Sequence, residues 1–389
     1  MLALFTGSAI FVSLGGLWLR RAFLSVCAAA FLWLQAGDPT NIAVLAAFVL
    51  SGYAAAWVLK ARPSTALLAL YIVALTIAFV VLKRYAFLVL VGGESLLAHT
   101  LDLIGLSFIF FRQIHYVVDV KQGDIKTLSL WGYLAYQFNP FTLLAGPIQR
   151  YQIFHEDWQK LAPQLDAHSQ RMAILRILLG VIKVAFIGDW CLQFALTEHD
   201  VSPLVQRAIL FYFYPAYVFF NFAGYCDIVI AGAALVGVRV PENFDKPYLA
   251  RNMIDFWTRW HRTLSFWIRD YVFTPLYMAI ARRKPGWAPS LAFVCYFVAL
   301  FLAGVWHGSS WNFVVFGVLN GIGVAAAKLW ENAIVAYGGR KGLKAYLANQ
   351  PIRWLAWFGT FHFVCFTQIF LRPESQDNIA ALWARVFGG

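Results

Sequence analysis

Residues 65–82 read TALLALYIVALTIAFVVL, an apolar run of 18 residues with no charged side chain. A helix rises about 1.5 Å per residue, so a run of this length can cross a hydrocarbon core about 30 Å thick. Similar runs recur along a chain of 389 residues, of which 61% are hydrophobic and 13% are charged. Lipid offers no partner to free backbone groups, and the runs lack the alternation of barrel strands. The sequence therefore predicts helices that span a membrane.

The apolar runs together predict an all-α polytopic membrane protein with about ten to twelve membrane-embedded helices. No polar insertion is long enough to form a second domain, so we expect a single domain over residues 1–389. The expected spans are residues 1–19, 22–36, 41–59, 65–82, 85–97, 101–118, 172–196, 204–237, 290–306, 311–335 and 352–371.

The charge balance is basic, with 31 Lys and Arg against 19 Asp and Glu and a formal net charge of +12. Basic loops orient a membrane chain and meet anionic lipid, which accounts for such an excess. The clusters at 282–284 and 340–344 also suit a phosphate-bearing or acidic cytoplasmic partner. No pattern in the chain indicates binding to nucleic acid.

The segment DFWTRWHRTLSFWIRDY at 255–271 is predicted to form one amphipathic helix. At 100° per residue, one side carries Asp255, Arg259, Arg262 and Arg269. The opposite side carries Trp257, Trp260, His261, Leu264, Trp267, Ile268 and Tyr271. This division places the arginines in water or headgroups and the tryptophans in an apolar environment. A lone histidine on an apolar face is most often a satisfied core residue, so this pattern alone assigns His261 no function.

The segment GVWHGSSWNF at 304–313 places His307 inside a long apolar run. Ionisable groups at membrane depth are rare and generally face a bundle interior or a water-filled cavity. Gly304 and Gly308 have the spacing of close helix approach. Hydrogen-bonding groups surround the histidine at Trp306, Ser309, Ser310, Trp311 and Asn312. A buried imidazole stays neutral, as a general base requires, although a structural hydrogen bond between two helices explains His307 equally well.

The histidines and cysteines show no metal-ligand spacing. The five cysteines lie singly in apolar segments, as small core residues do, and we expect neither a disulfide nor a catalytic thiol. Neither His261 nor His307 has a second ligand four residues away, and no carboxylate lies close to His307. We expect no metal site, while a haem held between two helices stays open.

Several blocks of the sequence resemble the membrane-bound O-acyltransferase family. The most specific is W-H-x-x-L-S-x-W-x-R-D at 260–270, followed by W-H-G at 306–308. LIGLSFIFFRQIHYVVDVKQG at 103–123 and FNPFTLLAGPIQRY at 138–151 resemble further blocks of the bacterial branch that acylates alginate or teichoic acid. The matching blocks span residues 103–323 in the same order and with similar spacing.

The resemblance implies a ring of tilted helices around a trans-membrane tunnel, with re-entrant or interfacial helices. It implies peripheral helices in 1–100, a catalytic core in 101–335 and a C-terminal loop and helix in 336–389. The implied catalytic residues are His307 and the second signature histidine, His261. The residues expected along the substrate tunnel are Trp260, Trp267, Trp306, Ser309, Ser310, Trp311 and Asn312.

The implied reaction moves a small acyl group, acetyl or D-alanyl, from a cytoplasmic thioester to a hydroxyl group. The acceptor would be an extracytoplasmic polysaccharide, a teichoic acid or a partner protein. The expected donor is acyl-CoA or an acidic carrier protein bearing an acyl phosphopantetheine, and no cofactor is expected to stay bound. We expect a separate extracytoplasmic acyltransferase or acceptor protein as partner, and a multi-pass location in the bacterial cytoplasmic (inner) membrane.

A second class of function is a transporter or flippase in which a buried histidine relays protons. Transporters tend to show internal repeats, and the two halves of this chain show no such correspondence.

Two polar features are expected to be structural or to line a cavity. Asp227 is interpreted as a partner for an arginine or a backbone group, and AGPIQRY at 145–151 as a re-entrant or broken element, or equally an interfacial loop.

Overall fold

The computed structural model describes residues 16–36, 38–83, 105–160, 165–308 and 310–372. Throughout these ranges every regular element is a helix and no strand forms, as predicted. Two compact units are present, one made of residues 1–180 and 226–241 and the other of 181–225 and 242–389. The expected span 85–97 and most of 1–19 lie outside the described residues. The single catalytic domain expected from the sequence stays a prediction.

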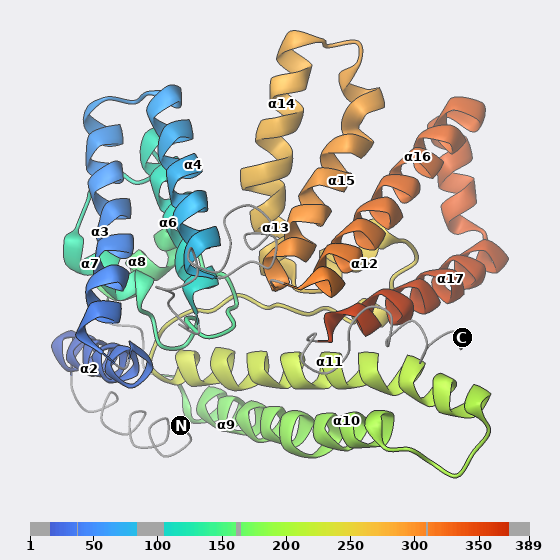
Figure 1. The fold of residues 1–389 in the computed structure, drawn as a ribbon, viewed down its shortest axis with the longest axis horizontal. Helices are drawn as coiled ribbons and strands as arrows, with labels where there is room; N and C mark the ends of the chain where they lie inside the picture. The colour runs from blue at the N-terminus through green and yellow to red at the C-terminus, as the bar shows by residue number, and fades with distance from the viewer. Residues whose placement is uncertain (1–15, 37, 84–104, 161–164, 309, 373–389) are drawn as a thin grey trace. The chain divides into compact units, whose positions relative to one another are not determined.

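The first unit is built from the N-terminal helices and the C-terminal end of the long helix α11, Pro203–Leu235 (Figure 1). Asp38 and Ser64 accept backbone N–H groups at the starts of the second and third of these helices, which fixes where they begin. Its helices are α2 (Leu17–Ala36), α3 (Pro39–Ala61), α4 (Thr65–Leu82), α6 (Leu106–Gln122), α7 (Leu130–Gln137), α8 (Tyr151–Gln159), most of α9 (Ala167–Ile182) and the last part of α11 (Pro203–Leu235).

Between α7 and α8 the backbone is irregular yet largely buried, as expected for a broken element at 145–151. Buried backbone carbonyls need partners, and Arg112 of α6 supplies them. Its guanidinium donates to the carbonyls of Tyr136 and Gln137 and to the hydroxyl of Thr142. His115, one turn further along α6, accepts the N–H of Tyr151 at 3.1 Å and so caps α8.

The second unit holds the remaining helices, including the two signature segments (Figure 1). Its largest helix, α16, is kinked at Gly339, where φ is 61°. The helices are the end of α9, the π-helix η2 (Lys183–Gly188), α10 (Asp189–Leu196), the first part of α11, the 3₁₀ turn η3 (Pro247–Leu249), α12 (Met253–Arg259), α13 (Arg262–Ile268), the π-helix η4 (Arg269–Phe273), α14 (Thr274–Arg283), α15 (Ala288–His307), α16 (Trp311–Ala348), α17 (Gln350–Gln368) and η5 (Ile369–Leu371).

Glycines allow α15 and α16 to pack with their backbones in contact. A Cβ atom added to Gly304 would collide with the Cα of Gly317, and one added to Gly321 would lie 3.0 Å from the carbonyl oxygen of Phe297. Gly304 therefore has the close-approach role predicted from the sequence. Gly308 lies beyond the end of α15, and a Cβ there would enter the ring of Phe313, so its role differs from the predicted one.

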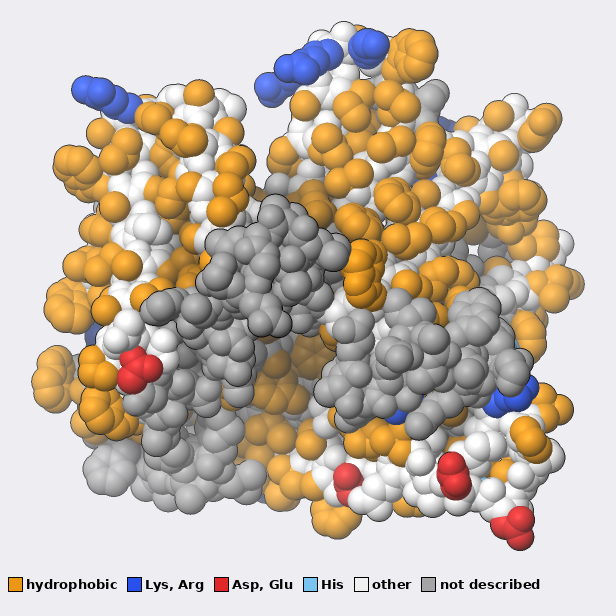
Figure 2. Space-filling view, viewed as in Figure 1, with side chains coloured by type: hydrophobic (Ala, Val, Ile, Leu, Met, Phe, Trp, Pro, Cys, Tyr) orange, Lys and Arg blue, Asp and Glu red, His pale blue; other side chains and the backbone are white. Residues whose placement is uncertain are grey.

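Five helices among the described residues are long and apolar enough to cross a membrane: α3, α4, α11, α16 and Gln350–Leu371. A shorter apolar helix covers Leu291–His307. Figure 2 shows hydrophobic side chains over the exposed surfaces of α3, α4, α14 and α15, where a soluble protein would carry polar residues. The chain is an all-α polytopic membrane protein, and the total of ten to twelve helices stays a prediction.

Candidate functional site

The signature segment at 255–271 is not one helix, and that prediction is wrong. α12 ends at Arg259, Trp260 is extended, and His261 adopts a left-handed conformation with φ 43° and ψ 50°. A buried asparagine, Asn243, explains why a new helix, α13, begins after the break. The carbonyl of Asn243 accepts the N–H of Arg262 at 2.9 Å, and its side-chain oxygen accepts the N–H and hydroxyl of Thr263. Asn243 thereby satisfies the first donors of α13.

The side of 255–271 that was predicted to be apolar is buried in spite of the helix break. The aromatic side is buried at Trp257, Trp260 and Trp267, while Arg269 is exposed and pairs with Asp270 at 2.8 Å. The helical wheel thus predicted the buried aromatic side, whereas on the charged side only Arg269 is exposed and Asp255, Arg259 and Arg262 are half-buried. The break itself depends on a contact with residue 243, which helical periodicity does not reveal.

His261 is held in a dry aromatic environment. Its side chain is 2% exposed, and its Nδ1 atom has no hydrogen-bond partner among the described residues. The imidazole meets the ring of Phe222 edge-on at 4.9 Å and that of Trp306 at 6.3 Å between centroids. Burial, and then the neighbouring His307 imidazole, lower the pKa of His261. His261 is therefore neutral at physiological pH.

His307 is the last residue of α15, beside the start of α16. Its ring lies 4.9 Å from the ring of Trp306, 5.7 Å from that of Phe316 and 6.5 Å from that of Phe313. The indole of Trp306 thus contacts both imidazoles. The structure brings together His261, Trp306 and His307, which lie 46 residues apart at the extremes of the sequence.

Of the other predicted tunnel residues, four are buried, one is exposed and one lies outside the described residues. Trp260 and Trp267 are buried, with Trp260 stacked on Phe256 at 5.6 Å. Ser310 and Asn312 are buried at the start of α16. Trp311 is 51% exposed, so its side chain does not belong to this buried group. Ser309 lies outside the described residues.

A mainly apolar pocket of about 180 Å³ lies between α12, α13, α15 and α16. Ala299 and Ala303 in its wall precede His307 by two turns and one turn on the same face of α15. Phe266 and Arg269 also line it, and the guanidinium of Arg269 lies 4.9 Å from the ring of Phe266, with that of Arg262 5.6 Å from the same ring. The further lining residues are Ile254, Trp257, Thr258, Leu264, Ser265, Ile268, Phe273, Tyr296, Leu300 and Val324.

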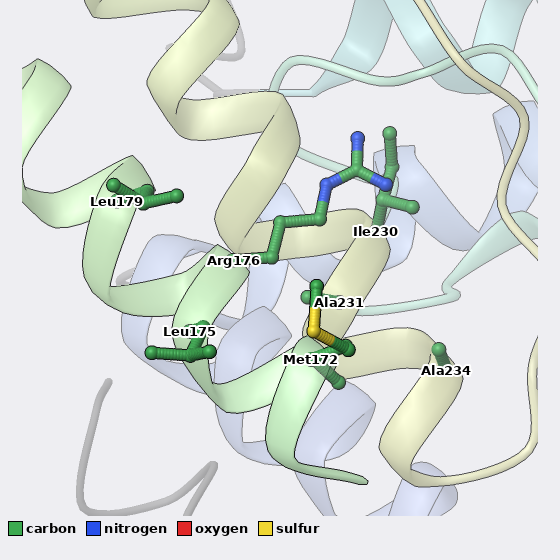
Figure 3. Close-up of a pocket in the computed structure, with 8 residues that line it drawn as sticks. Met172, Leu175, Arg176, Leu179, Ile230, Ala231 and Ala234 are labelled. Atoms are coloured by element: carbon green, nitrogen blue, oxygen red, sulfur yellow. The ribbon is translucent and has the colours of Figure 1, made fainter. Parts of the chain in front are cut away.

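A separate hollow of about 400 Å³ occurs in the first unit, between α9 and the end of α11 (Figure 3). The guanidinium of Arg176 in its wall is bonded to Asp227 at 2.8 Å. This ion pair confirms the prediction that Asp227 serves as a partner for an arginine. The other lining residues are Met172, Ala173, Leu175, Leu179, Ile230, Ala231 and Ala234. None of the predicted site residues contributes to this hollow.

Sequence reasoning missed Asn243 and Phe222, which respectively set the backbone at His261 and contact its ring. Both lie outside the segments whose periodicity was informative, and their type alone does not distinguish them from other polar or aromatic residues. In the described part of the chain, no group of three or more His, Cys, Asp or Glu residues could hold a metal ion.

The fold and these residues define an integral membrane protein in which a buried histidine, His261, and a half-buried one, His307, both contact Trp306. The sequence pattern of the membrane-bound O-acyltransferase family matches residues 45–369. The chain belongs to that family and is an acyltransferase. A transporter or flippase without acyl-transfer chemistry is therefore not needed to explain the two signature histidines.

Similar proteins include two groups of bacterial enzymes. Teichoic acid D-alanyltransferase of Streptococcus thermophilus is 31% identical over 70% of this chain and 68% of its own length. The enzyme of the same name from Bacillus subtilis is 29% identical over 68% of this chain and 67% of its own length. Probable alginate O-acetylase of Azotobacter vinelandii is 29% identical over 74% of this chain but only 54% of its own length.

Proposed function

We propose that the chain transfers a small acyl group from a thioester to a hydroxyl of an extracytoplasmic acceptor, with His307 as the general base. The observation that carries this proposal is the position of His261 and His307 in contact with Trp306. The aromatic rings of Trp306, Phe313 and Phe316 surround the half-buried imidazole of His307, and a neutral imidazole can accept a proton. The family supplies the reaction class, acyl transfer.

The proposed reaction has two steps. The acceptor oxygen attacks the thioester carbonyl carbon while the imidazole of His307 takes the hydroxyl proton. The tetrahedral intermediate then collapses, the C–S bond breaks, and the leaving thiolate takes the proton from the imidazolium. The ester and the free thiol leave, and His307 is neutral again. His261 stays neutral throughout, and its unpartnered Nδ1 is available to a substrate group.

The proposed donor is acyl-CoA or an acyl carrier protein, which would approach from the cytoplasm. Exposed Arg282 and Arg283 in the last turn of α14, with Lys284 following, form a basic end suited to phosphate or to an acidic protein. The acceptor would be a teichoic acid, a polysaccharide or a partner protein on the other side of a bacterial inner membrane. The names of the similar enzymes support both acetyl and D-alanyl as the acyl group.

The test is release of free thiol by the purified protein in detergent. Acetyl-CoA, acetyl carrier protein and D-alanyl carrier protein are each supplied with a polyol acceptor. One of these donors is expected to release thiol in proportion to acceptor ester formed, and omitting the acceptor should reduce the rate to slow hydrolysis. Ester formation without any of these thioesters, or none with all of them, would contradict the proposal.

A further inference from the structure

Ser310 is a buried serine at the start of α16 whose hydroxyl has no partner in the described part of the chain. Serine at the N-cap of a helix ordinarily accepts a backbone N–H two or three residues on. The Ser310 hydroxyl makes no such capping bond. Its side chain is 8% exposed, and its Oγ atom has no hydrogen-bond partner among the described residues. Burying an unpaired hydroxyl costs free energy, so its presence calls for a reason.

Ser310 follows His307 by three residues and caps the end of α16 that packs against it, with an extended backbone. Positions 313 and 316, three residues apart in the first turns of α16, share a helical face. The rings of Phe313 and Phe316 on that face contact the His307 imidazole. A Cβ atom added to Gly308 would collide with the ring of Phe313, so a glycine is needed where α15 meets this face. Ser310 therefore lies at the end of the helix that contacts the proposed base, and its hydroxyl bonds to no described residue.

The position also suits a developing negative charge. Backbone N–H groups at the start of a helix point outward and carry a partial positive charge. A tetrahedral intermediate of acyl transfer places a full negative charge on the former carbonyl oxygen. A second buried polar atom without a partner in the described structure is Nδ1 of His261, whose ring lies 6.3 Å from that of Trp306 between centroids. The Ser310 hydroxyl and the His261 Nδ1 atom, which bond to no described residue, are therefore available to a polar atom of a substrate.

We propose that the Ser310 hydroxyl donates a hydrogen bond to the thioester carbonyl oxygen as it becomes an oxyanion. This inference rests on the proposed function, with His307 as base. When the acceptor oxygen bonds to the carbonyl carbon, the C=O π electron pair moves to that oxygen, which Ser310 then holds. The pair returns to re-form C=O as the C–S bond breaks. Ser310 forms no covalent bond and gives up no proton.

The test compares Ser310→Ala with the wild-type protein. Loss of one donor to an oxyanion is expected to lower kcat by about 10²- to 10³-fold with little change in the donor KM, because the bond strengthens only in the transition state. The thermal unfolding temperature should not fall, since the hydroxyl bonds to no described residue. A structural serine would show the reverse pattern, a lower unfolding temperature with a smaller change in kcat.

Two further comparisons isolate the hydroxyl itself. Ser310→Thr and Ser310→Val introduce side chains of similar shape, and only the threonine variant should retain most of the activity. Thr360→Val is the matched control, because the Thr360 hydroxyl is 9% exposed and already bonded to the carbonyl of Ala356. Its kcat should equal that of the wild-type protein.

Specific results overturn the inference. Wild-type kcat in Ser310→Ala, equal activity in the threonine and valine variants, or an acyl group found on Ser310 by mass spectrometry would each do so. His307→Ala separates this inference from the proposed function. If that variant stays active, the proposed function fails. If it is inactive while Ser310→Ala is fully active, only the role of Ser310 fails.

Discussion

At the scale of single residues, Trp306 relates the two signature histidines. Its indole contacts both imidazoles, although His261 follows a helix break and His307 ends a long helix. His307 was recognisable from the sequence because an ionisable group at membrane depth is unusual, whereas His261 was singled out only by the family resemblance. Their shared contact with Trp306 was not, since periodicity relates residues only within one element. The site thus depends on packing between α13 and α15.

The backbone of His261 gives a prediction at this scale. A non-glycine residue at φ 43° is strained, and asparagine tolerates this conformation better than a β-branched residue does. Both His261→Asn and His261→Val lose the ring contact with Phe222. We expect the valine variant to be less stable than the asparagine variant by about 1–2 kcal/mol. Thermal unfolding in detergent measures this difference, and equal stabilities would show that the left-handed turn is unstrained.

At the scale of elements, the sequence predicted which sides of helices are buried better than where the helices end. The expected span 65–82 coincides with α4, because Ser64 caps it and the apolar run fills it. The expected span 311–335 begins with α16 and ends shortly before the kink at Gly339, beyond which a polar helical segment with Arg340 and Lys341 continues to Ala348. Hydropathy marks the membrane-embedded part of a helix, not the helix itself.

The packing of α15 on α16 gives a prediction at the scale of elements. Gly304→Ala would place a methyl group against the backbone of Gly317 and force the helices apart. We expect a loss of about 1–3 kcal/mol of stability, as for other overpacked sites, together with lower activity because His307 lies one turn away. Gly342→Ala, in the part of α16 beyond the kink and with open space around it, is the control and should be neutral or slightly stabilising.

Thermal unfolding and acyl-transfer rate, measured for both glycine variants, distinguish close packing from a general effect of added methyl groups. A stable and fully active Gly304→Ala protein would show that α15 and α16 separate at no cost. Equal losses in both variants would point to helix propensity rather than to the contact with Gly317.

At the scale of the whole molecule, composition alone indicated that the chain lies in a lipid bilayer. With 61% hydrophobic residues and apolar runs of helical length, only a helical membrane protein accommodates the chain. The resemblance of 260–270 and 306–308 to a known family then supplied the reaction class, which the match over 45–369 confirms. Neither composition nor these motifs identify the acyl group, because the similar enzymes carry names for both acetyl and D-alanyl transfer.

The central claim, that one neutral imidazole accepts the acceptor's proton, is tested most directly by the acyl-transfer rate of His307→Ala. Loss of a general base should lower kcat by about 10²- to 10⁴-fold without lowering the unfolding temperature enough to unfold the protein at the assay temperature. His168→Ala, at an exposed position in α9, should keep the wild-type rate. A His307→Ala protein that transfers acyl groups within a few-fold of the wild-type rate would contradict the account.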